Sequence, residues 1–395
     1  MIVRKTRPEE ALRVNQLFAI AFEMALQNCP ADPSNPKVHH WAAYTDDGDM
    51  MSTLTINDYR MNFDGKECRM AGVGGVATLP QYRRNGGIRA CFQASLPDLY
   101  AQGYDFSYLY PFSTAYYRKF GYETCVQKLS WELDLSLLNL PKVAGTLRLA
   151  EGGDALLDAV MALDALWERK YNMMVLHTSE DYKWLTETDP AVKQEFTYVY
   201  SASDGTAKGC TTFRTVAESS GRNLICSRFC FADKEGFYGL LSLFKAMSSD
   251  HAFMKFQTPA DAGLQYLMPE WSLGAAKWSV LANAGMVRVV NAVEVLKKTR
   301  YVGTGRLTLQ IHDPIIPEND GVFALEFRNG QAVSVQRTKA EPDLTLPINL
   351  FSALIAGVCN FDDARNWMDG IEIRNPQAPF SQVFYRKPMM IVDFF

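Results

Sequence analysis

Residues 76–89 read Val-Ala-Thr-Leu-Pro-Gln-Tyr-Arg-Arg-Asn-Gly-Gly-Ile-Arg, and this stretch decides how the first part of the chain folds. An apolar strand ends near Pro80, a short basic turn follows, and an amphipathic helix starts at Ile88. The first amides of a helix lack partners within it, and the helix dipole favours an anion beside them. Gly86 and Gly87 have no Cβ, so a ligand can come close to their backbone. The turn therefore predicts a pyrophosphate site, with a solvated strand-to-helix connection as the plainer alternative.

Two motifs carry a resemblance to a known family. The turn lacks both the glycine spacing of a dinucleotide fold and the Gly-Lys-Ser/Thr ending of a P-loop. Arg83, Gly86 and Ile88 instead resemble Arg-x-x-Gly-x-Gly/Ala, the acetyl-CoA motif of GNAT acetyltransferases. Residues 117–122, Tyr-Arg-Lys-Phe-Gly-Tyr, resemble the Tyr-x-Lys-x-Gly-Phe/Tyr motif near the end of the same fold. Ile88 departs from the GNAT pattern, but a bulky aliphatic residue there is similar to the Eis family (enhanced intracellular survival proteins).

Composition narrows the classes of function. A chain of 395 residues predicts two or three domains, and 48% hydrophobic with 21% charged residues are values of an ordinary globular protein. The net charge of −4 argues against a nucleic-acid or acidic-membrane surface, because both need clustered basic charge. The chain has no apolar run as long as a membrane span, and its N-terminus lacks a signal-peptide pattern. We therefore expect a cytoplasmic protein.

The eight cysteines are scattered along the chain. Cys226 and Cys230 lie four apart in an expected strand, and no histidine is spaced to complete a zinc site with them. Reduced thiols are the simpler interpretation for a cytoplasmic protein. The sequence predicts no metal.

The order of elements predicts an α/β (α+β) protein of three domains. Residues 1–140 alternate strands and helices as a GNAT-type acetyltransferase unit does, and residues 141–295 repeat that opening. Residues 296–395 change to alternating strands with an Asn329-Gly330 hairpin turn, followed by an apolar helix. This last segment resembles the sterol-carrier-protein-2-like domain that ends Eis proteins. The predicted architecture is two tandem GNAT-type units followed by a sterol-carrier-protein-like α+β domain.

The second unit is expected to be degenerate. Residues 232–238, Ala-Asp-Lys-Glu-Gly-Phe-Tyr, stand where the first unit has its basic turn. Asp233 and Glu235 would repel a diphosphate there, at a cost on the order of 1 kcal/mol even at a surface. We therefore expect acetyl-CoA to bind the first unit alone.

The resemblance implies where acetyl-CoA, the co-substrate, binds. Gly72, Gly74 and Gly75 would weaken a regular strand and indicate a bulge or a close ligand. The pantetheine arm would bond to the strand backbone that follows, where one amide can also stabilise the oxyanion. The implied contacts are Val76, Ala77 and Thr78 for pantetheine, Arg84, Asn85, Gly86, Gly87, Ile88 and Arg89 for the pyrophosphate, and Phe112 and Ser113 beside the arm.

Tyr117 is the candidate proton donor to the departing thiolate, a role that the family motif implies. Its reference pKa near 10 against about 8.5 for a thiol makes full proton transfer uphill by roughly 2 kcal/mol. We therefore expect a strong hydrogen bond with only partial or late transfer. The alternative is an aromatic core residue, since Tyr108, Tyr110, Tyr116 and Tyr122 are close in the sequence.

The chain ends at Phe395, and the resemblance implies that its carboxylate is the proton acceptor. A terminal carboxylate has a reference pKa near 3.5, far below the ~10 of an alkyl ammonium. It would therefore orient a neutral amine and take the proton once attack has made the nitrogen acidic. Asp393 is the competing carboxylate.

The predicted function is acetyl-CoA-dependent N-acetylation of a primary amine. The family implies aminoglycoside-like polyamines or lysine side chains as acceptors, and a homohexamer as the assembly. Glu23, Asp46, Asp47 and Asp49 are candidates for an acidic acceptor pocket, while residues 39–41, His-His-Trp, are expected in a loop. The alternative is a non-catalytic protein whose third domain carries an apolar ligand beside a relic acetyl-CoA site.

Overall fold

The structure, a computed structural model, describes residues 1–29, 31, 35–125, 128–151, 156–187, 189–219, 221–267, 276–281 and 285–395. Contacts divide the chain into two compact units. The first contains Met1–Val126, Asn283–Lys387 and Val392–Phe395, and the second contains Gln127–Ala282 and Pro388–Ile391. Each unit thus joins segments that are far apart in the sequence. None of the described helices has the length and apolar character needed to cross a membrane.

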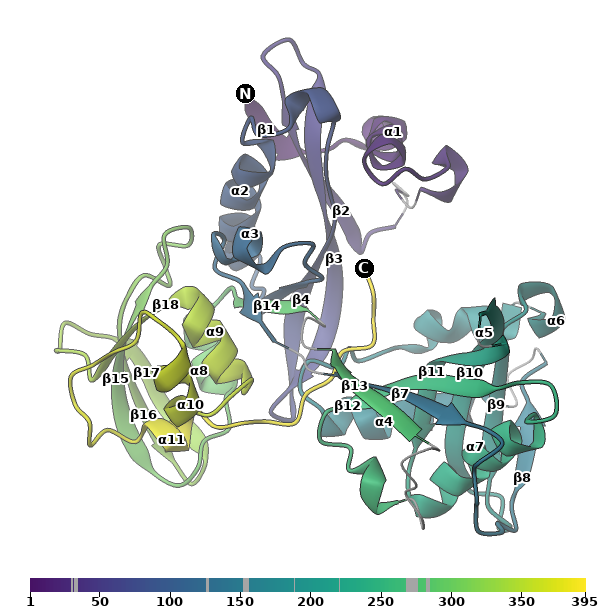
Figure 1. The fold of residues 1–395 in the computed structure, drawn as a ribbon. Helices are drawn as coiled ribbons and strands as arrows, with labels where there is room; N and C mark the ends of the chain where they lie inside the picture. The colour runs from purple at the N-terminus through teal and green to yellow at the C-terminus, as the bar shows by residue number, and fades with distance from the viewer. Residues whose placement is uncertain are drawn as a thin grey trace. The chain divides into compact units, whose positions relative to one another are not determined.

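The first unit contains a seven-stranded sheet in the order β1-β2-β3-β4-β5-β14-β6. Helices α1 (Ala11–Ala21) and α2 (Gly87–Ala101) lie on opposite sides of it (Figure 1). Each buries apolar residues at helical spacing against the sheet, Phe18 from α1 and Phe92 from α2 among them. The strands are β1 (Ile2–Lys5), β2 (Val38–Tyr44), β3 (Met50–Phe63), β4 (Lys66–Thr78), β5 (Phe106–Leu109), β6 (Glu123–Thr124) and β14 (Met286–Val289).

Strand β2 corrects one expectation. His39, His40 and Trp41 lie within β2 and not in a loop. Ala42 packs on the α1 side and Ala43 on the α2 side, so the strand is covered on both faces. A strand buried on both faces does not show the alternation of apolar and polar residues that marks a half-exposed strand. The loop prediction was wrong for that reason.

The second unit repeats the arrangement of the first. In both, four antiparallel strands are followed by a fifth that pairs in parallel: β8-β9-β10-β11-β12 here and β1-β2-β3-β4-β5 before. The strands are β7 (Lys128–Asp134), β8 (Thr146–Leu149), β9 (Phe196–Ser201), β10 (Ala207–Glu218), β11 (Gly221–Phe231), β12 (Phe253–Pro259) and β13 (Ala276–Leu281). The helices are α4 (Leu157–Lys170), α5 (Lys183–Glu187), α6 (Pro190–Lys193) and α7 (Lys234–Ala246).

The third sheet has the order β17-β16-β15-β18-β19. The Asn329-Gly330 hairpin is present, and both residues have the positive φ, 51° and 79°, that a tight hairpin turn requires. The strands are β15 (Gly305–His312), β16 (Gly321–Arg328), β17 (Gln331–Arg337), β18 (Leu344–Pro347) and β19 (Glu372–Ile373). The helices are α8 (Ala292–Lys298), α9 (Ile348–Ala356), α10 (Phe361–Trp367) and α11 (Phe380–Val383).

Two strands near the expected domain junctions belong to the sheet of the neighbouring domain range. β7 pairs with β12 and β13 of the second sheet, and β14 pairs with β5 and β6 of the first. The edge strand of a sheet has unpaired backbone N–H and C=O groups that can pair with any strand lying beside it, so strand order in a sheet need not follow sequence order. The domain ranges 1–140, 141–295 and 296–395 stay a prediction.

Candidate active site

Strand β4 leaves its neighbour β5 halfway along its length. The two pair in parallel from Met70 opposite Phe106 to Val73 opposite Leu109. Beyond Val73, β4 runs on to Thr78 and pairs with β3 alone among the described strands. The backbone of β4 over residues 74–78 is therefore open on the β5 side, as an added extended ligand requires.

A β-bulge accompanies this separation. The β3–β4 register shifts between Thr53 and Thr55, so β4 has one residue more than β3 there. Gly75 in the bulge has a φ of +52°, and a Cβ on it would lie 2.6 Å from the Phe18 ring and from Thr55 Oγ1. Only glycine fits this position. The bulge expected from the glycines is thus present.

The residues expected to hold pantetheine lie in this open stretch. Val76 is half-buried, Ala77 is buried against the α1 side, and the Thr78 hydroxyl lies 2.9 Å from that of Ser52. Their side chains are held by the sheet while the β5-side edge of the backbone stays open. Their contacts with acetyl-CoA stay a prediction.

The basic turn leads directly into α2. Gly86 caps the helix with a φ of +81°, and a Cβ on Gly87 would lie 2.4 Å from Ser52 Oγ. The turn of the helix begins with the bond from Ala90 N–H to the Gly86 carbonyl, so the amides of the three residues before Ala90 have no partner within the helix. Gly86 is needed for its backbone conformation and Gly87 for its contact with β3.

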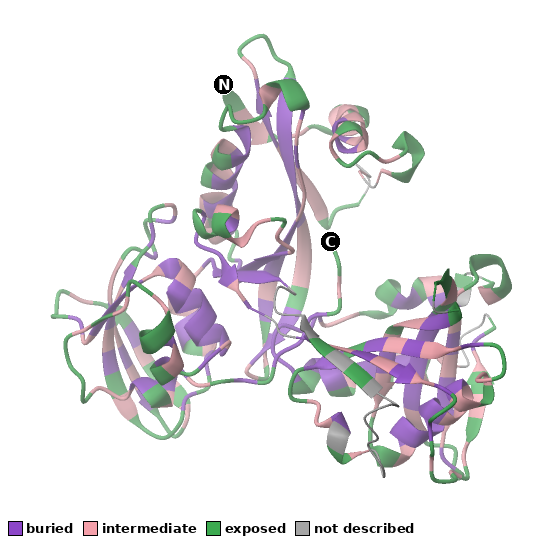
Figure 2. Ribbon diagram, in the orientation of Figure 1, coloured by how far each residue is buried: buried purple, intermediate pink, exposed green. Residues whose placement is uncertain are grey.

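The arginines of this turn face solvent. Arg83, Arg84, Asn85 and Arg89 are exposed (Figure 2). None of the three arginines pairs with a carboxylate in the part of the chain that the structure describes. Free guanidinium groups beside unpartnered helix amides form a ready anion site.

Tyr117 lies in the short helix α3 (Thr114–Arg118), which Ser113 caps through a 3.4 Å bond from Tyr116 N–H. Its ring is buried, with Phe112 and Tyr116 each 5.3 Å away between centroids. Burial, with a smaller effect of Tyr116, raises the pKa of Tyr117 above its ordinary value. The phenol therefore stays protonated and can donate a hydrogen bond, but full transfer to a thiolate becomes harder than the reference pKa implies.

Phe112 lies just before α3 at the end of β5. Its side chain is 73% exposed although it is a large aromatic ring. Its ring meets the buried ring of Tyr117 at 5.3 Å between centroids, so one side packs on the tyrosine while the rest faces solvent. The sequence motif located this segment, but its exposure is visible only in the fold.

The chain terminus is seated on β4. A Cβ on Gly72 would lie 2.8 Å from the Phe395 ring, and a Cβ on Gly74 would lie 2.7 Å from the Phe395 carboxyl carbon. The two glycines thus make room for the last residue, whose carboxyl group takes the place of a Gly74 side chain. The terminus lies on the α1 side of this sheet (Figure 1).

Aromatic residues hold this terminus. The Phe395 ring has Tyr59, Tyr110 and Tyr108 at 5.4, 5.7 and 5.9 Å between centroids. The Tyr110 hydroxyl donates a 2.5 Å hydrogen bond to the Asp393 carbonyl. Sequence reasoning missed this role of the tyrosines, because the crowding of tyrosines near Tyr117 gave no sign of a partner from the far end of the chain.

The acidic residues expected near an acceptor are engaged elsewhere or exposed. Asp46 pairs with the N-terminal ammonium at 2.5 Å, and Asp49 accepts a 3.3 Å hydrogen bond from Tyr82 in the basic turn. Glu23 and Asp47 are exposed. A cavity of about 230 Å³ borders His39 and His40, but Lys5 and Arg7 also line it, so it lacks the acidic lining expected for a polyamine.

In the second unit, the turn that corresponds to the basic turn is occupied by side chains of the protein itself. Asp233 caps α7 by accepting from Gly236 N–H at 3.0 Å, and Lys208 Nζ pairs with Asp233 at 2.9 Å and Glu235 at 2.7 Å. A Cβ on Gly236 would lie 2.0 Å from the Lys208 carbonyl. The anion position is therefore taken by the protein's own carboxylates.

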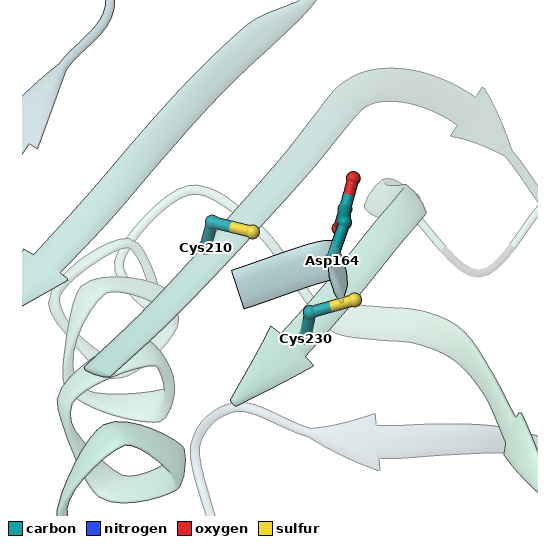
Figure 3. A group of neighbouring side chains, drawn as sticks. All are labelled: Asp164, Cys210 and Cys230. Carbon is teal, nitrogen blue, oxygen red and sulfur yellow. The ribbon is translucent and has the colours of Figure 1, made fainter. Parts of the chain in front are cut away.

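One group of potential metal ligands occurs among the described residues of the second unit. Asp164, Cys210 and Cys230 come from α4, β10 and β11, with ligand atoms within 4.8 Å of one another (Figure 3). Arg228 Nε lies 3.1 Å from the Asp164 carboxylate, which also accepts a 2.8 Å hydrogen bond from Tyr182. A hydrogen bond with Cys210, together with burial, raises the pKa of the Cys230 thiol. A guanidinium and the neutral Cys230 thiol suit a buried hydrogen-bonded core better than a cation site.

Comparisons with known proteins agree with this geometry. Residues 2–125 match the family model of the acetyltransferase (GNAT) domain, and residues 272–387 match that of the sterol carrier protein domain. An uncharacterized N-acetyltransferase of Streptomyces coelicolor is 25% identical over 315 residues, which are 76% of this chain and 75% of the relative.

Solved structures share the whole fold. A probable N-acyltransferase of Enterococcus faecalis has a TM-score of 0.85 at 21% identity, covering 100% of this chain and 99% of its own. Eis1 of Mycobacterium abscessus has a TM-score of 0.79 at 17% identity and covers 100% of both chains. At these identities the likeness shows the fold alone. The predicted fold class is confirmed, and the chain is an enzyme, an N-acetyltransferase with a GNAT domain and a C-terminal sterol carrier protein domain.

Proposed function

We propose that this N-acetyltransferase moves the acetyl group of acetyl-CoA directly to a primary amine, on an aminoglycoside-like polyamine or a lysine side chain. Tyr117 is the proton donor to the departing thiolate, and the C-terminal carboxylate of Phe395 is the proton acceptor. One observation carries the proposal most: the carboxyl carbon stands at the side-chain position of Gly74, the first residue of the open stretch of β4. This position supports the role of the carboxylate as proton acceptor, because it adjoins the stretch where we expect the thioester.

Acetyl-CoA would lie along the first sheet. Backbone groups of Val76, Ala77 and Thr78 would bond the pantetheine arm, and Phe112 and Ser113 would flank it. The pyrophosphate would sit on the start of α2, within reach of Arg84, Asn85, Gly86, Gly87, Ile88 and Arg89. The free amides and exposed arginines of that turn support this placement.

The acid–base roles follow from the environment of each group. A neutral amine attacks the thioester carbonyl, and its nitrogen becomes acidic enough to give a proton to a carboxylate. A backbone amide of the open β4 stretch would stabilise the oxyanion that forms. Tyr117, kept protonated by burial, would then donate a hydrogen bond to the thiolate as the carbon–sulfur bond breaks.

The family properties beyond the GNAT and sterol carrier domains belong to this proposal too. Eis1 shares the fold over the whole chain, which supports an Eis-like enzyme. Assembly as a homohexamer and a cytoplasmic location rest on the resemblance alone. The alternative of a non-catalytic apolar-ligand carrier does not fit a chain whose residues 2–125 match an acetyltransferase domain.

The decisive experiment moves the terminal carboxylate. Two appended glycines displace it by about 7 Å, and we expect turnover to be lost while acetyl-CoA still binds. Phe394→Leu is the matched control, because it changes the neighbouring ring, which is 81% exposed, and leaves Phe395 and its carboxylate unaltered, so it should keep most of the activity. CoA release with polyamines, aminoglycosides and lysine peptides measures turnover, and calorimetry measures binding.

Asp393→Asn tests the competing carboxylate. It should keep most of the turnover, since Asp393 contacts Tyr110 through its backbone carbonyl. If the extended protein stays active and Asp393→Asn is inactive, the proton acceptor is Asp393 and the proposal for Phe395 is wrong.

A further inference from the structure

A row of three positions crosses the first sheet at the proposed proton acceptor. His40 of β2 lies opposite Thr55 of β3, and Thr55 lies opposite Gly74 of β4. Directly opposed residues point to the same face, with Cβ atoms about 5 Å apart. The Phe395 carboxyl group occupies the side-chain position of Gly74. The row therefore reads His40, Thr55, terminal carboxylate.

A hydrogen bond already joins two members of this row. His40 Nδ1 and Thr55 Oγ1 are 2.9 Å apart, and the Phe18 ring covers the imidazole edge-on at 6.1 Å. Burial, and after it the neighbouring His39, lowers the pKa of His40 to about 4. The imidazole is therefore neutral at neutral pH. With its single proton on Nδ1 it donates to Thr55, whose own hydroxyl proton is then left for the carboxylate.

The second unit supplies an internal comparison. Its β10–β11 register shifts between Thr212 and Phe213, as the β3–β4 register shifts between Thr53 and Thr55. The row beside that shift consists of Phe196, Phe213 and Cys226. That row lies on the α7 face, because Phe213 meets Phe244 of α7 at 5.2 Å between ring centroids. The row on the α4 face, the counterpart of the α1 face, consists of Thr197, Thr212 and Arg228. Both units thus have a polar row at this place, and in the first unit the row meets the carboxyl group of the chain terminus.

We propose that Thr55, oriented by His40, is a positioning residue that donates a hydrogen bond to the C-terminal carboxylate of Phe395 and fixes it as the proton acceptor. This inference rests on the proposed function of that carboxylate. If the terminal residue were flexible, its carboxylate would often point away from the amine, and acetyl transfer would slow. Misplacing a catalytic group by about 1 Å lowers the rate by up to roughly a hundredfold. The hydrogen bond from Thr55 would hold the carboxylate in one orientation.

The test removes one hydroxyl group. Thr55→Val keeps the shape of the side chain, and we expect kcat to fall by about tenfold or more with the KM for acetyl-CoA unchanged. Thr55→Ser should restore most of kcat. Thr212→Val is the matched control, because it breaks a buried 2.9 Å hydroxyl pair with Thr197 at the same kind of strand position in the second unit. It should leave kcat unchanged.

Asn57 is the competing donor to the carboxylate. Its Nδ2 donates to the Gly72 carbonyl at 3.1 Å and lies 3.9 Å from the Gly74 Cβ position. If Asn57→Leu lowers kcat while Thr55→Val changes it by less than about threefold, the donor is Asn57 and the inference is overturned.

Two comparisons separate this inference from the proposed function. If two appended glycines abolish turnover but Thr55→Val does not, the carboxylate is the acceptor and only the positioning role fails. If the glycines leave turnover intact, the acceptor itself is wrongly assigned. A further measurement needs no acceptor substrate. ¹⁵N-histidine NMR should show that His40 is protonated at Nδ1 and that the two appended glycines change the chemical shifts of its ring nitrogens. An unchanged His40 signal overturns the inference.

Discussion

At the scale of the residue, Tyr117 shows how one side chain serves both packing and chemistry. Its ring belongs to the core between α2 and the sheet, where it meets Phe92 edge-on at 6.1 Å. The two interpretations of the sequence, core residue and proton donor, are therefore compatible. Burial, which makes it a core residue, also keeps its phenol protonated.

Tyr117→Phe separates the two roles, because it keeps the ring and removes only the hydroxyl group. We expect kcat to fall by about a hundredfold, the lower end of what a positioned acid supplies, with little change in thermal stability. Stopped turnover assays with detection of free CoA, paired with thermal denaturation, measure both quantities. Turnover within about threefold of the unmodified enzyme would exclude the donor role.

At the scale of the element, the basic turn and the start of α2 carry the groups that we expect to bind an anion. Gly86 is required locally, by its positive φ, whereas Gly87 is required by its close contact with Ser52 of β3. Arg84 also has a positive φ, 70°, which an arginine adopts at some cost in strain. Strain of this kind is typical of functional turns, and it fits a side chain aimed at a ligand.

Arg84→Glu tests this element. A negative charge in the basic turn should repel the pyrophosphate and weaken acetyl-CoA binding at least about tenfold, or roughly 1.4 kcal/mol. The fold should tolerate the change, since a carboxylate at a helix N-terminus is favourable. Lys234→Glu at the start of α7 is the matched control and should leave the affinity unchanged in calorimetry. A larger loss from Lys234→Glu would assign acetyl-CoA to the second unit.

At the scale of the whole molecule, segments distant in sequence complete the first unit. Arg288 of β14 pairs with Asp313 beyond β15 at 2.7 Å, and both side chains are fully buried. Arg288 Nη1 also donates to the Phe120 carbonyl at 2.8 Å, just after the helix that carries Tyr117. A residue outside the GNAT match thus supports the segment of the proposed proton donor.

Asp313→Ala should leave the Arg288 guanidinium buried without its carboxylate. Removing one partner of a buried pair costs about 3–5 kcal/mol in the free energy of unfolding. Glu326→Ala, which breaks the surface pairs with the exposed Arg306 and Arg328, is the control and should cost less than about 1 kcal/mol. Urea denaturation of both variants measures the difference, and equal losses would contradict the assignment.

The sequence by itself determined the local features: the basic turn with its glycines, the hairpin at Asn329-Gly330, and the segment around Tyr117. Turn chemistry, capping and periodicity act over a few residues, so they can be read directly from the chain. Only the tertiary structure decided that β2 is a strand, that β14 completes the first sheet, and that His40 and Thr55 stand in line with the Phe395 carboxylate. These arrangements depend on pairing between residues far apart in the chain. Such pairing follows from burial and register, which no local pattern encodes.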